Sequence, residues 1–193
     1  MAEWQHSIVS YLDLVDIKDL IKKGNSIASS EMRDFHQFIQ KKALEKLPLH
    51  KNIYVWNDSI LFLSFTGEGY SLYEPIMKEL DTFKAVIDKR WRCYAISVKG
   101  KTFPPPSNQE TAGDKFVYLR ASSFAFANCF AIEAEGKKIK GKKPSWYVDI
   151  RIVKHIKTST QFKRKLITMQ PTERPRTIFM YYDHLWKNTQ TVL

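Results

Sequence analysis

The stretch "SIVSYLDLVDIKDLI", residues 7–21, decides the fold that we expect for this chain. An apolar run from Ile8 to Leu12 is typical of a buried strand, and helical spacing of apolar residues begins at Ile17. Asp13 stands between the two patterns. A carboxylate at the end of a buried strand loses solvation unless it has a partner. Asp13 is therefore the first candidate for a functional residue.

The rest of the first hundred residues repeats these two patterns. Apolar residues recur at helical spacing over residues 16–47 and again over 71–89. The segment 51–65 reads as two strands joined at Asn57-Asp58, a pair that tolerates the left-handed backbone of a tight turn. A fourth strand is predicted over 91–100. The predicted order is β-α-β-β-α-β, the ferredoxin-like arrangement of the α+β class.

The second half of the chain is expected to complete the same domain with extra strands and a helix. No shift in composition marks a boundary, so we expect one domain over 1–193, with a core at about 7–135 and a completion at 136–193. The helix predicted at 121–133 is apolar on nearly every side, so it is buried in the core or against a second subunit. The other expected elements are a loop at 101–115, a short strand at 116–120, an alternating strand at 145–156 and an apolar tail at 176–186 that docks on the body.

The chain is basic, with 31 Lys+Arg against 20 Asp+Glu and a net charge of +11. This balance favours a polyanionic partner: a nucleic acid, a nucleoside triphosphate or an anionic membrane surface. The basic runs 135–143 and 157–165 also fit an ordinary solvated surface. No apolar run approaches the roughly 20 residues of a membrane span, and the N-terminus lacks a signal-peptide pattern. With Cys93 and Cys129 read as buried thiols, we expect a cytoplasmic protein without membrane association.

Asp13 and Asp58 are predicted to meet at one edge of the sheet. In a βαββαβ sheet the first and third strands are central neighbours, so the turn that carries Asp58 lies near the end of the first strand. Two adjacent carboxylates repel each other unless a cation lies between them. Mg²⁺ bound through one or two carboxylates and substrate phosphates fits this pair, and a second ion would give a two-metal site.

The backbone that follows Asp13 could bind phosphates. The first helix is expected to begin within a few residues, which would leave free N–H groups near Val15, Asp16 and Ile17 at the same edge. The N-terminus of a helix favours anions. The alternative is that Asp13 or Asp16 only caps the helix, because Asp is a favoured cap, and that Asp58 is only a turn residue.

The segments "YLDLVDIKDLI" (11–21) and "NIYVWNDSILFLSFTG" (52–67) resemble the catalytic core of the class III nucleotidyl cyclases. That family carries an aromatic residue, any residue, an Asp and an aliphatic residue before a Gly-Phe-Thr, and a Gly-Asp at the turn between its second and third strands. Asp13 and Asp58 fall on its two metal-binding aspartates. This chain departs from the pattern in having Asp16-Ile17-Lys18 for Gly-Phe-Thr and Asn57 for Gly.

A third departure concerns the base of the nucleotide. In purine cyclases a Lys or a Glu four positions before the second aspartate reads the base, and here that position is Tyr54. With this residue the chain resembles the bacterial pyrimidine cyclases of the Pycsar anti-phage system, which make cyclic UMP or cyclic CMP. A Tyr hydroxyl can donate or accept, so it suits either base. The resemblance favours a uridylate over a cytidylate cyclase only because uridylate cyclases are the commoner kind in that family. Tyr54 also fits an ordinary strand aromatic.

The resemblance implies a homodimer with active sites at the subunit interface. In the family, one subunit supplies the aspartates and the other supplies the base-reading side chain. An Asn and an Arg four residues apart on the apolar helix hold the ribose and the transition state, but here Ala125 and Cys129 fall near those positions. Arg120, just before the helix, is the candidate substitute because a guanidinium suits a base or a phosphate. Asn128 is a weaker candidate for substrate binding.

The resemblance also implies the reaction and its cofactors. Asp13 and Asp58, with a backbone carbonyl near Leu14, would hold two Mg²⁺ or Mn²⁺ ions. The ribose 3′-oxygen of UTP or CTP would attack the α-phosphorus in line, and pyrophosphate would leave. In a defence system a separate effector protein would respond to the cyclic nucleotide and need not bind the cyclase.

Two other functions remain open at this point. RNA-binding domains share the βαββαβ order and stack bases on sheet aromatics, a part that Tyr54, Trp56 and Phe62 could play. Against this, the strand "SILFLSF" (59–65) lacks the Lys/Arg-Gly-aromatic-Gly-Phe pattern of such domains. A catalytically inactive cyclase homologue that only binds nucleotide is the other alternative, because the Asn/Arg pair is missing.

Overall fold

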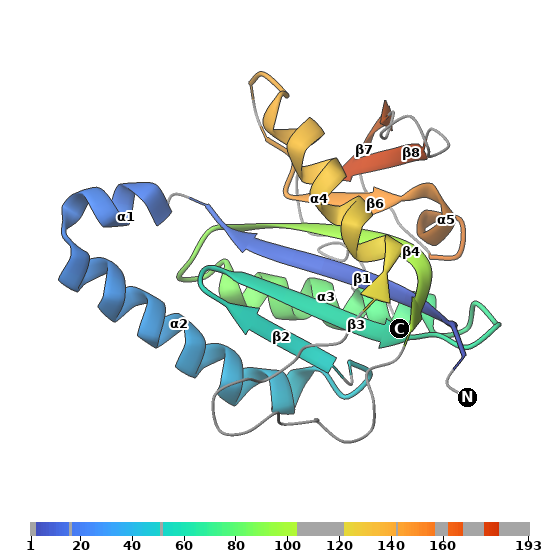
Figure 1. The fold of residues 1–193 in the computed structure, drawn as a ribbon, viewed down its shortest axis with the longest axis horizontal. Coiled ribbons are helices and arrows are strands. Elements are labelled where there is room, and N and C mark those ends of the chain that lie inside the picture. The colour runs from blue at the N-terminus through green and yellow to red at the C-terminus, as the bar shows by residue number, and fades with distance from the viewer. Residues whose placement is uncertain are drawn as a thin grey trace, which may run out of the picture.

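The computed structural model describes residues 3–15, 17–50, 52–103, 122–141, 143–156, 162–167 and 176–181. They form a mixed α+β fold in which one sheet carries helices on both faces (Figure 1). The strands are β1 (Gln5–Leu14), β2 (Asn52–Trp56), β3 (Ser59–Phe65), β4 (Cys93–Phe103), β5 (Ser122–Ser123), β6 (Trp146–Asp149), β7 (Phe162–Ile167) and β8 (Arg176–Tyr181). The helices are α1 (Ile17–Lys23), α2 (Asn25–Lys46), α3 (Tyr73–Ile87), α4 (Phe124–Lys137) and α5 (Ile150–Val153).

The first strand is central in the sheet, as the sequence predicts. β1 pairs antiparallel with β3 on one side and with β4 on the other, and β2 pairs antiparallel with β3. The order β2-β3-β1-β4 is that of the ferredoxin-like fold, so the predicted fold class is confirmed. β6 extends the sheet in parallel to β4, and β8 and β7 follow it, while β5 pairs with the end of β4.

Alternation along β1 divides its side chains between two cores. Ile8 and Leu12 face the core that α2 and α3 cover, whereas Val9 and Tyr11 face the core that α4 covers on the other side of the sheet (Figure 1). Successive side chains of a strand point to opposite faces. Asp13 therefore shares the face of Val9 and Tyr11, and the site that it forms lies on the α4 side.

Two predicted elements differ from the structure, and one strand was not predicted. Within 16–47 the sequence predicts a second helical segment capped by Ser29 or Ser30; the second helix instead begins at Asn25, because the chain turns at Gly24, whose φ of 133° is accessible mainly to glycine. The strand expected over 145–156 ends at Asp149, whose carboxylate accepts from the Arg151 N–H at 2.9 Å and caps the short helix α5. β7 arises in a segment that we had interpreted only as a basic surface. The strand expected at 116–120 lies outside the described residues.

The apolar helix α4 is buried on one face only. Its buried face packs so closely on β4 that a Cβ added to Gly100 would lie 2.6 Å from the Cβ of Ala125. On the opposite face Phe124 and Phe130 are 67% and 41% exposed. The sequence predicts that this helix is buried in the core or against a second subunit. One side of α4 is indeed buried in the core, whereas the other side is exposed and apolar.

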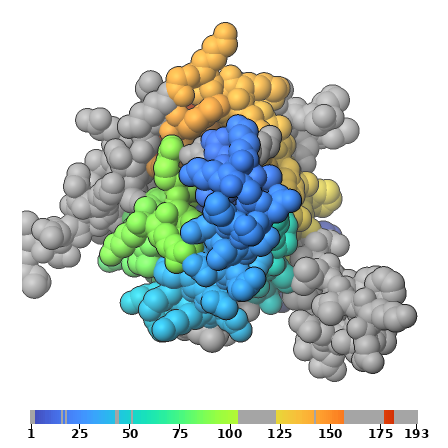
Figure 2. Space-filling view, turned by 90° about the vertical axis from the view of Figure 1, so that its left-hand side faces the viewer, coloured from blue at the N-terminus to red at the C-terminus, as the bar shows by residue number. Residues whose placement is uncertain are grey.

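The α1–α2 side of the molecule lies beside the hairpin that carries Asp58. Figure 2 looks onto this side, with α1 and α2 in blue, residues of α3 and β4 in green, and residues that follow α4 in orange. His36 of α2 donates from Nε2 to the carbonyl oxygen of Asn57 at 2.5 Å, which ties α2 to the β2–β3 turn. Among the helices that the structure describes, none combines the length and apolar composition needed to cross a membrane.

Candidate active site

The β2–β3 hairpin brings Asp58 to the end of β1, as predicted. Asp13 lies opposite Ser59 in the antiparallel register, and the Leu14 N–H donates to the Asp58 carbonyl oxygen at 3.1 Å. The turn needs a left-handed residue, and Asn57 supplies it with a φ of 49°. Asn is among the few residues besides Gly that tolerate this region, so the replacement of the expected Gly does not disturb the hairpin.

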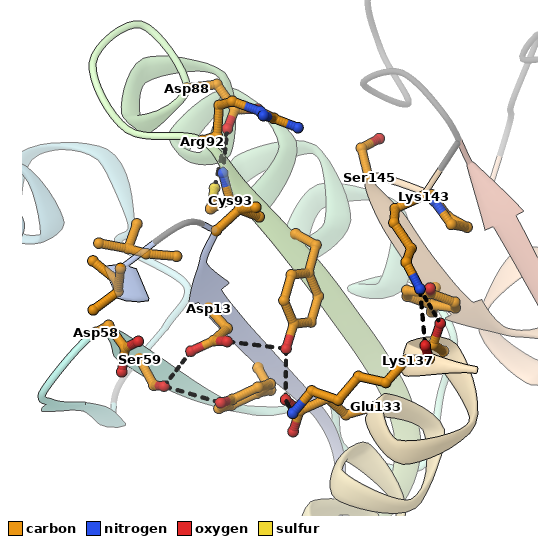
Figure 3. Close-up of a pocket in the computed structure, with 18 of the residues that line it drawn as sticks. Asp13, Asp58, Ser59, Asp88, Arg92, Cys93, Glu133, Lys137, Lys143 and Ser145 are labelled. Atoms are coloured by element: carbon orange, nitrogen blue, oxygen red, sulfur yellow. Dashed lines mark hydrogen bonds and ion pairs between the residues drawn. The ribbon is translucent and has the colours of Figure 1, made fainter. Parts of the chain in front are cut away.

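An open cavity of about 1110 Å³ lies over this edge of the sheet (Figure 3). Residues from the β1 end, the hairpin, α1, β4 and α4 surround it, so it collects segments that are distant in the chain. Its polar and charged lining includes Asp13, Asp19, Lys22, Asp58, Ser59, Lys84, Asp88, Arg92, Tyr94, Glu133, Lys137 and Lys143. Acidic groups from the end of β1 and the hairpin therefore share one cavity with basic groups from the segment before β4 and from the end of α4.

Asp13 has a hydrogen bond on each of its carboxylate oxygens. The Ser59 hydroxyl donates to Oδ1 at 2.6 Å, and the Tyr94 hydroxyl lies 3.0 Å from Oδ2. Burial raises the pKa of the Asp13 carboxyl, and the Asp58 charge adds to this rise, while the two hydrogen bonds oppose it. The carboxylate is thus held in place but destabilised as an anion in the metal-free protein.

This environment fits a divalent cation. A bound cation would offset both the lost solvation of Asp13 and its repulsion from Asp58. Carboxylate and carbonyl oxygens are the ligands that Mg²⁺ and Mn²⁺ prefer, and Mg²⁺ commonly uses only one or two protein carboxylates besides water and phosphates. Among the residues that the structure describes, no group of three or more His, Cys, Asp or Glu side chains is placed to hold a metal. Asp13 and Asp58 therefore fit a cation that also uses substrate oxygens.

The predicted phosphate-binding backbone is only partly available. The N–H of Val15 donates to the Arg92 carbonyl oxygen at 2.8 Å, so the expectation that this N–H is free is wrong. The bond arises because β1 and β4 continue their pairing past the last strand residues. Ile17 begins α1 and lines the cavity together with Leu14 and Val15, while Asp16 lies outside the described residues.

Cationic side chains near the cavity differ in what they can offer to a phosphate. The Lys143 ammonium donates to the carbonyl oxygens of Gly136, Lys137 and Ile139 at 3.2, 3.0 and 2.6 Å. All three of its donors therefore satisfy the C-terminal end of α4, where a cation also interacts well with the helix dipole. Arg92 is exposed and lines the same cavity, and its guanidinium has the geometry that suits a phosphate.

Other predicted residues lie away from this cavity or outside the described chain. Tyr54 is half-buried on the α4 face of β2 and does not line the cavity, and burial raises the pKa of its hydroxyl. Asn128 is buried within α4, and among the described residues its Nδ2 atom has no hydrogen-bond partner. Arg120 lies outside the described residues. Ala125 and Cys129, which were expected near the Asn/Arg positions of the cyclases, are fully buried and pack against the sheet.

Sequence reasoning missed Ser59, Tyr94, Arg92 and Glu133. Ser59 and Tyr94 lie directly opposite Asp13 in the strands on either side. The pairing register, once known, would have identified both of them. Glu133 is ion-paired with Lys137 one helical turn later on α4. The sequence alone predicts the i, i+4 pair of Glu133 and Lys137, but it does not predict that Glu133 lies beside Tyr94.

Neither a family model nor a curated protein matches this sequence. Solved structures do match its fold. The guanylyl cyclase Cya2 superposes with a TM-score of 0.60 at 9% identity, over 97% of this chain and 97% of that one. The fold is that of a nucleotide cyclase catalytic domain. A guanylate cyclase domain from Catenaria anguillulae in complex with GTP matches with a TM-score of 0.56 at 9% identity, over 94% of this chain and 100% of its own.

A similar fold also forms about half of a longer solved protein. A bacterial light-regulated adenylyl cyclase superposes with a TM-score of 0.61 at 7% identity, over 96% of this chain but only 53% of its own. Identities this low establish the shared fold and leave substrate and activity to be argued from the residues.

Proposed function

We propose that this chain is a nucleotide cyclase that converts a nucleoside triphosphate to a 3′,5′-cyclic nucleotide and pyrophosphate. The observation that carries the proposal is the pair of carboxylates, Asp13 and Asp58, which the main chain joins at one edge of a cyclase-type sheet and which face an open cavity. A structural role alone does not explain why a half-buried carboxylate lies beside a second one.

Asp13 and Asp58, with the Leu14 carbonyl, would hold two Mg²⁺ or Mn²⁺ ions. Bound there, such ions lower the pKa of the ribose 3′-hydroxyl and neutralise phosphate charge. The chain itself orients the reaction: Ser59 and Tyr94 fix the Asp13 carboxylate, and Arg92 contributes positive charge at the cavity rim. The 3′-oxygen forms its bond to the α-phosphorus as the bond to pyrophosphate breaks, so catalysis depends on positioning and charge.

The substrate that we propose is a pyrimidine nucleotide, UTP before CTP. Tyr54 occupies the position where purine cyclases carry a Lys or Glu, and its hydroxyl can donate or accept a hydrogen bond. The product would serve as a second messenger in bacterial anti-phage defence and would be read by a separate effector. Both points rest on the sequence resemblance.

A homodimer would explain why Tyr54 lies outside the cavity of its own chain. Trp56, Phe126 and Phe130 form a continuous aromatic surface, with ring centroids 6.2 Å apart between Trp56 and Phe126 and 4.7 Å apart between Phe126 and Phe130. Trp56 and Phe130 are 38% and 41% exposed. Large exposed aromatics in one patch are typical of protein interfaces. A partner seated there would cover this surface and receive Tyr54 from across the interface.

The proposal is tested by incubating the purified protein with Mn²⁺ and each of ATP, GTP, CTP and UTP, and identifying products by mass. Cyclic UMP or cyclic CMP is expected, and it should be absent with Asp13→Ala. Cyclic AMP or GMP would keep the cyclase and overturn the pyrimidine preference. No cyclic product from any nucleotide would overturn the activity and favour an inactive nucleotide-binding homologue.

The RNA-binding alternative has less support. Phe62, one of its three candidate stacking residues, is fully buried against Phe83 at a centroid distance of 5.8 Å. α4 covers the face of the sheet to which Tyr54 belongs. A base could not reach Phe62, and an open aromatic sheet face is what such domains require.

A further inference from the structure

Tyr94 occupies an unusual position between two carboxylates. It lies on β4 opposite Asp13 in the strand register, and its hydroxyl oxygen is 3.0 Å from Asp13 Oδ2 and 2.7 Å from Glu133 Oε1. Glu133 comes from α4 on the same face of the sheet, and its side chain is only 11% exposed. Figure 3 shows Asp13 and Glu133 on either side of the dashed contacts that join them through this hydroxyl.

Glu133 contacts the Tyr94 hydroxyl rather than the Asp13 carboxylate in this arrangement. In the part of the chain that the structure describes, no three carboxylate, imidazole or thiolate groups are placed to share one metal ion. The Tyr94 hydroxyl stands between Glu133 and Asp13. Any influence of Glu133 on the geometry of Asp13 therefore passes through Tyr94.

The hydrogen bonds on Asp13 leave both of its carboxylate oxygens able to bind a cation, so the group could bridge two cations. A carboxylate offers about four lone-pair sites, two on each oxygen. Ser59 uses one site on Oδ1, and Tyr94 can use one site on Oδ2. One site remains on each oxygen, and the plane of the group is fixed from both sides. A carboxylate in free rotation would have to be ordered each time it binds a cation, at a cost in conformational entropy.

We propose that Tyr94, anchored by Glu133, is a positioning residue that fixes the Asp13 carboxylate for cation binding. This inference rests on the proposed function, because it assigns Asp13 to a metal site. A phenol has one proton to donate, so Glu133 also competes with Asp13 for it. The Glu133 contact limits the movement of the Tyr94 side chain, and the proposal requires that the Tyr94 hydroxyl donates to Asp13 in the cation-bound state.

The test compares Mn²⁺ binding to the nucleotide-free full chain and to Tyr94→Phe, by counting free Mn²⁺ in electron paramagnetic resonance spectra. Loss of an outer-shell partner commonly weakens metal binding about 10- to 100-fold, and we expect a weakening in that range. Tyr70→Phe is the matched control, since Tyr70 stacks on His155 and does not line the cavity. Cyclase activity of Tyr94→Phe should recover at saturating Mn²⁺, with kcat close to that of the wild type.

The outcomes separate this inference from the proposed function. If the wild type binds Mn²⁺ and Tyr94→Phe binds it equally well, positioning by Tyr94 is overturned while the metal site stands. If the nucleotide-free wild type binds no Mn²⁺ but still forms a cyclic nucleotide with it, the inference about Tyr94 is overturned while the cyclase activity stands; absence of both binding and product overturns both. Glu133→Ala should weaken binding more in the wild type than in Tyr94→Phe; an equal effect in both would mean that Glu133 acts by charge alone and would overturn its anchoring role.

Discussion

The N–H of Leu14 donates to the carbonyl oxygen of Asp58 over 3.1 Å, so the end of β1 is joined to the β2–β3 turn through the main chain. This contact does not involve either aspartate side chain. The two carboxylates are consequently held near each other by the backbone, and a change of one side chain should leave the other in position.

Asp58→Ala should therefore abolish activity without unfolding the protein. Removal of one metal ligand forfeits several kcal/mol of transition-state stabilisation, or at least about a 100-fold loss of rate. The measurements are product formation and the midpoint of thermal unfolding. A variant that unfolds at the wild-type temperature and retains wild-type turnover would refute the role of Asp58.

Asp13→Asn should raise the stability of the metal-free protein at neutral pH. Because burial raises the pKa of Asp13 in the folded state, folding favours the protonated carboxyl, and this contribution is lost as pH rises through the folded-state value. Asn removes the charge and can donate to the Tyr94 oxygen. The gain in unfolding free energy should disappear below about pH 4, where the unfolded Asp is also protonated. Urea unfolding at several pH values, with chelator present, measures it.

His50 should make the protein sensitive to mild acid. Burial lowers the pKa of His50 to about 4, and its Nδ1 bonds to the Ser64 hydroxyl at 2.5 Å. The folded state therefore resists protonation, and its stability falls as pH drops from the ordinary value near 6.5 towards 4, by roughly 3 kcal/mol. His50→Gln should flatten the dependence of the unfolding free energy on pH in this window. An unchanged slope would show that other groups dominate acid unfolding.

Gly100→Ala should destabilise the contact between β4 and α4. The added Cβ would lie 2.6 Å from the Cβ and 3.3 Å from the Cα of Ala125, so the helix would have to move, at a cost of about 1–3 kcal/mol. Gly136→Ala is the matched control. Its Cβ would meet the far end of the Tyr147 side chain at 2.7 Å, and Ala gains up to about 1 kcal/mol in helix propensity. Chemical denaturation should rank Gly100→Ala as the more harmful change.

The aromatic surface of Trp56, Phe126 and Phe130 should be a subunit interface. Phe130→Glu places a charge in the patch and should produce monomers by analytical ultracentrifugation, with loss of activity but not of fold. Mixing inactive Asp58→Ala with inactive Tyr54→Ala should restore part of the activity, because one site of the mixed dimer keeps both wild-type residues. Failure of the mixture, with each variant still dimeric, would place Tyr54 outside the shared site.

The sequence predicts the sheet better than it predicts the surroundings of Asp13. The apolar run from Ile8 to Leu12 and the turn at Asn57 are local signals, and they are sufficient to place β1 between its neighbours and Asp58 beside Asp13. Tyr94 and Glu133 reach Asp13 through pairings across 81 and 39 residues. Such contacts depend on register and helix placement, which no short pattern specifies.

Local capping explains where the prediction of elements failed. Alternating residues continue through Ile150 and Ile152, and they favoured a strand, but the Asp149 carboxylate starts a helix instead. Val15 was expected to offer a free N–H, yet strand pairing to Arg92 uses it. At Asp149 a single hydrogen bond outweighs the alternation of side chains. At Val15 a single hydrogen bond uses the N–H that the start of a helix would have left free.

The left-handed Asn57 has a consequence for how relatives of this chain can be found. A comparison that scores residue letters penalises an exchange of Gly for Asn, although the backbone angle, 49°, is one that both residues can adopt. The hairpin requires a particular backbone torsion angle rather than a particular residue type. A comparison of backbone geometry can therefore detect the similarity of two folds where a comparison of residue letters finds no match.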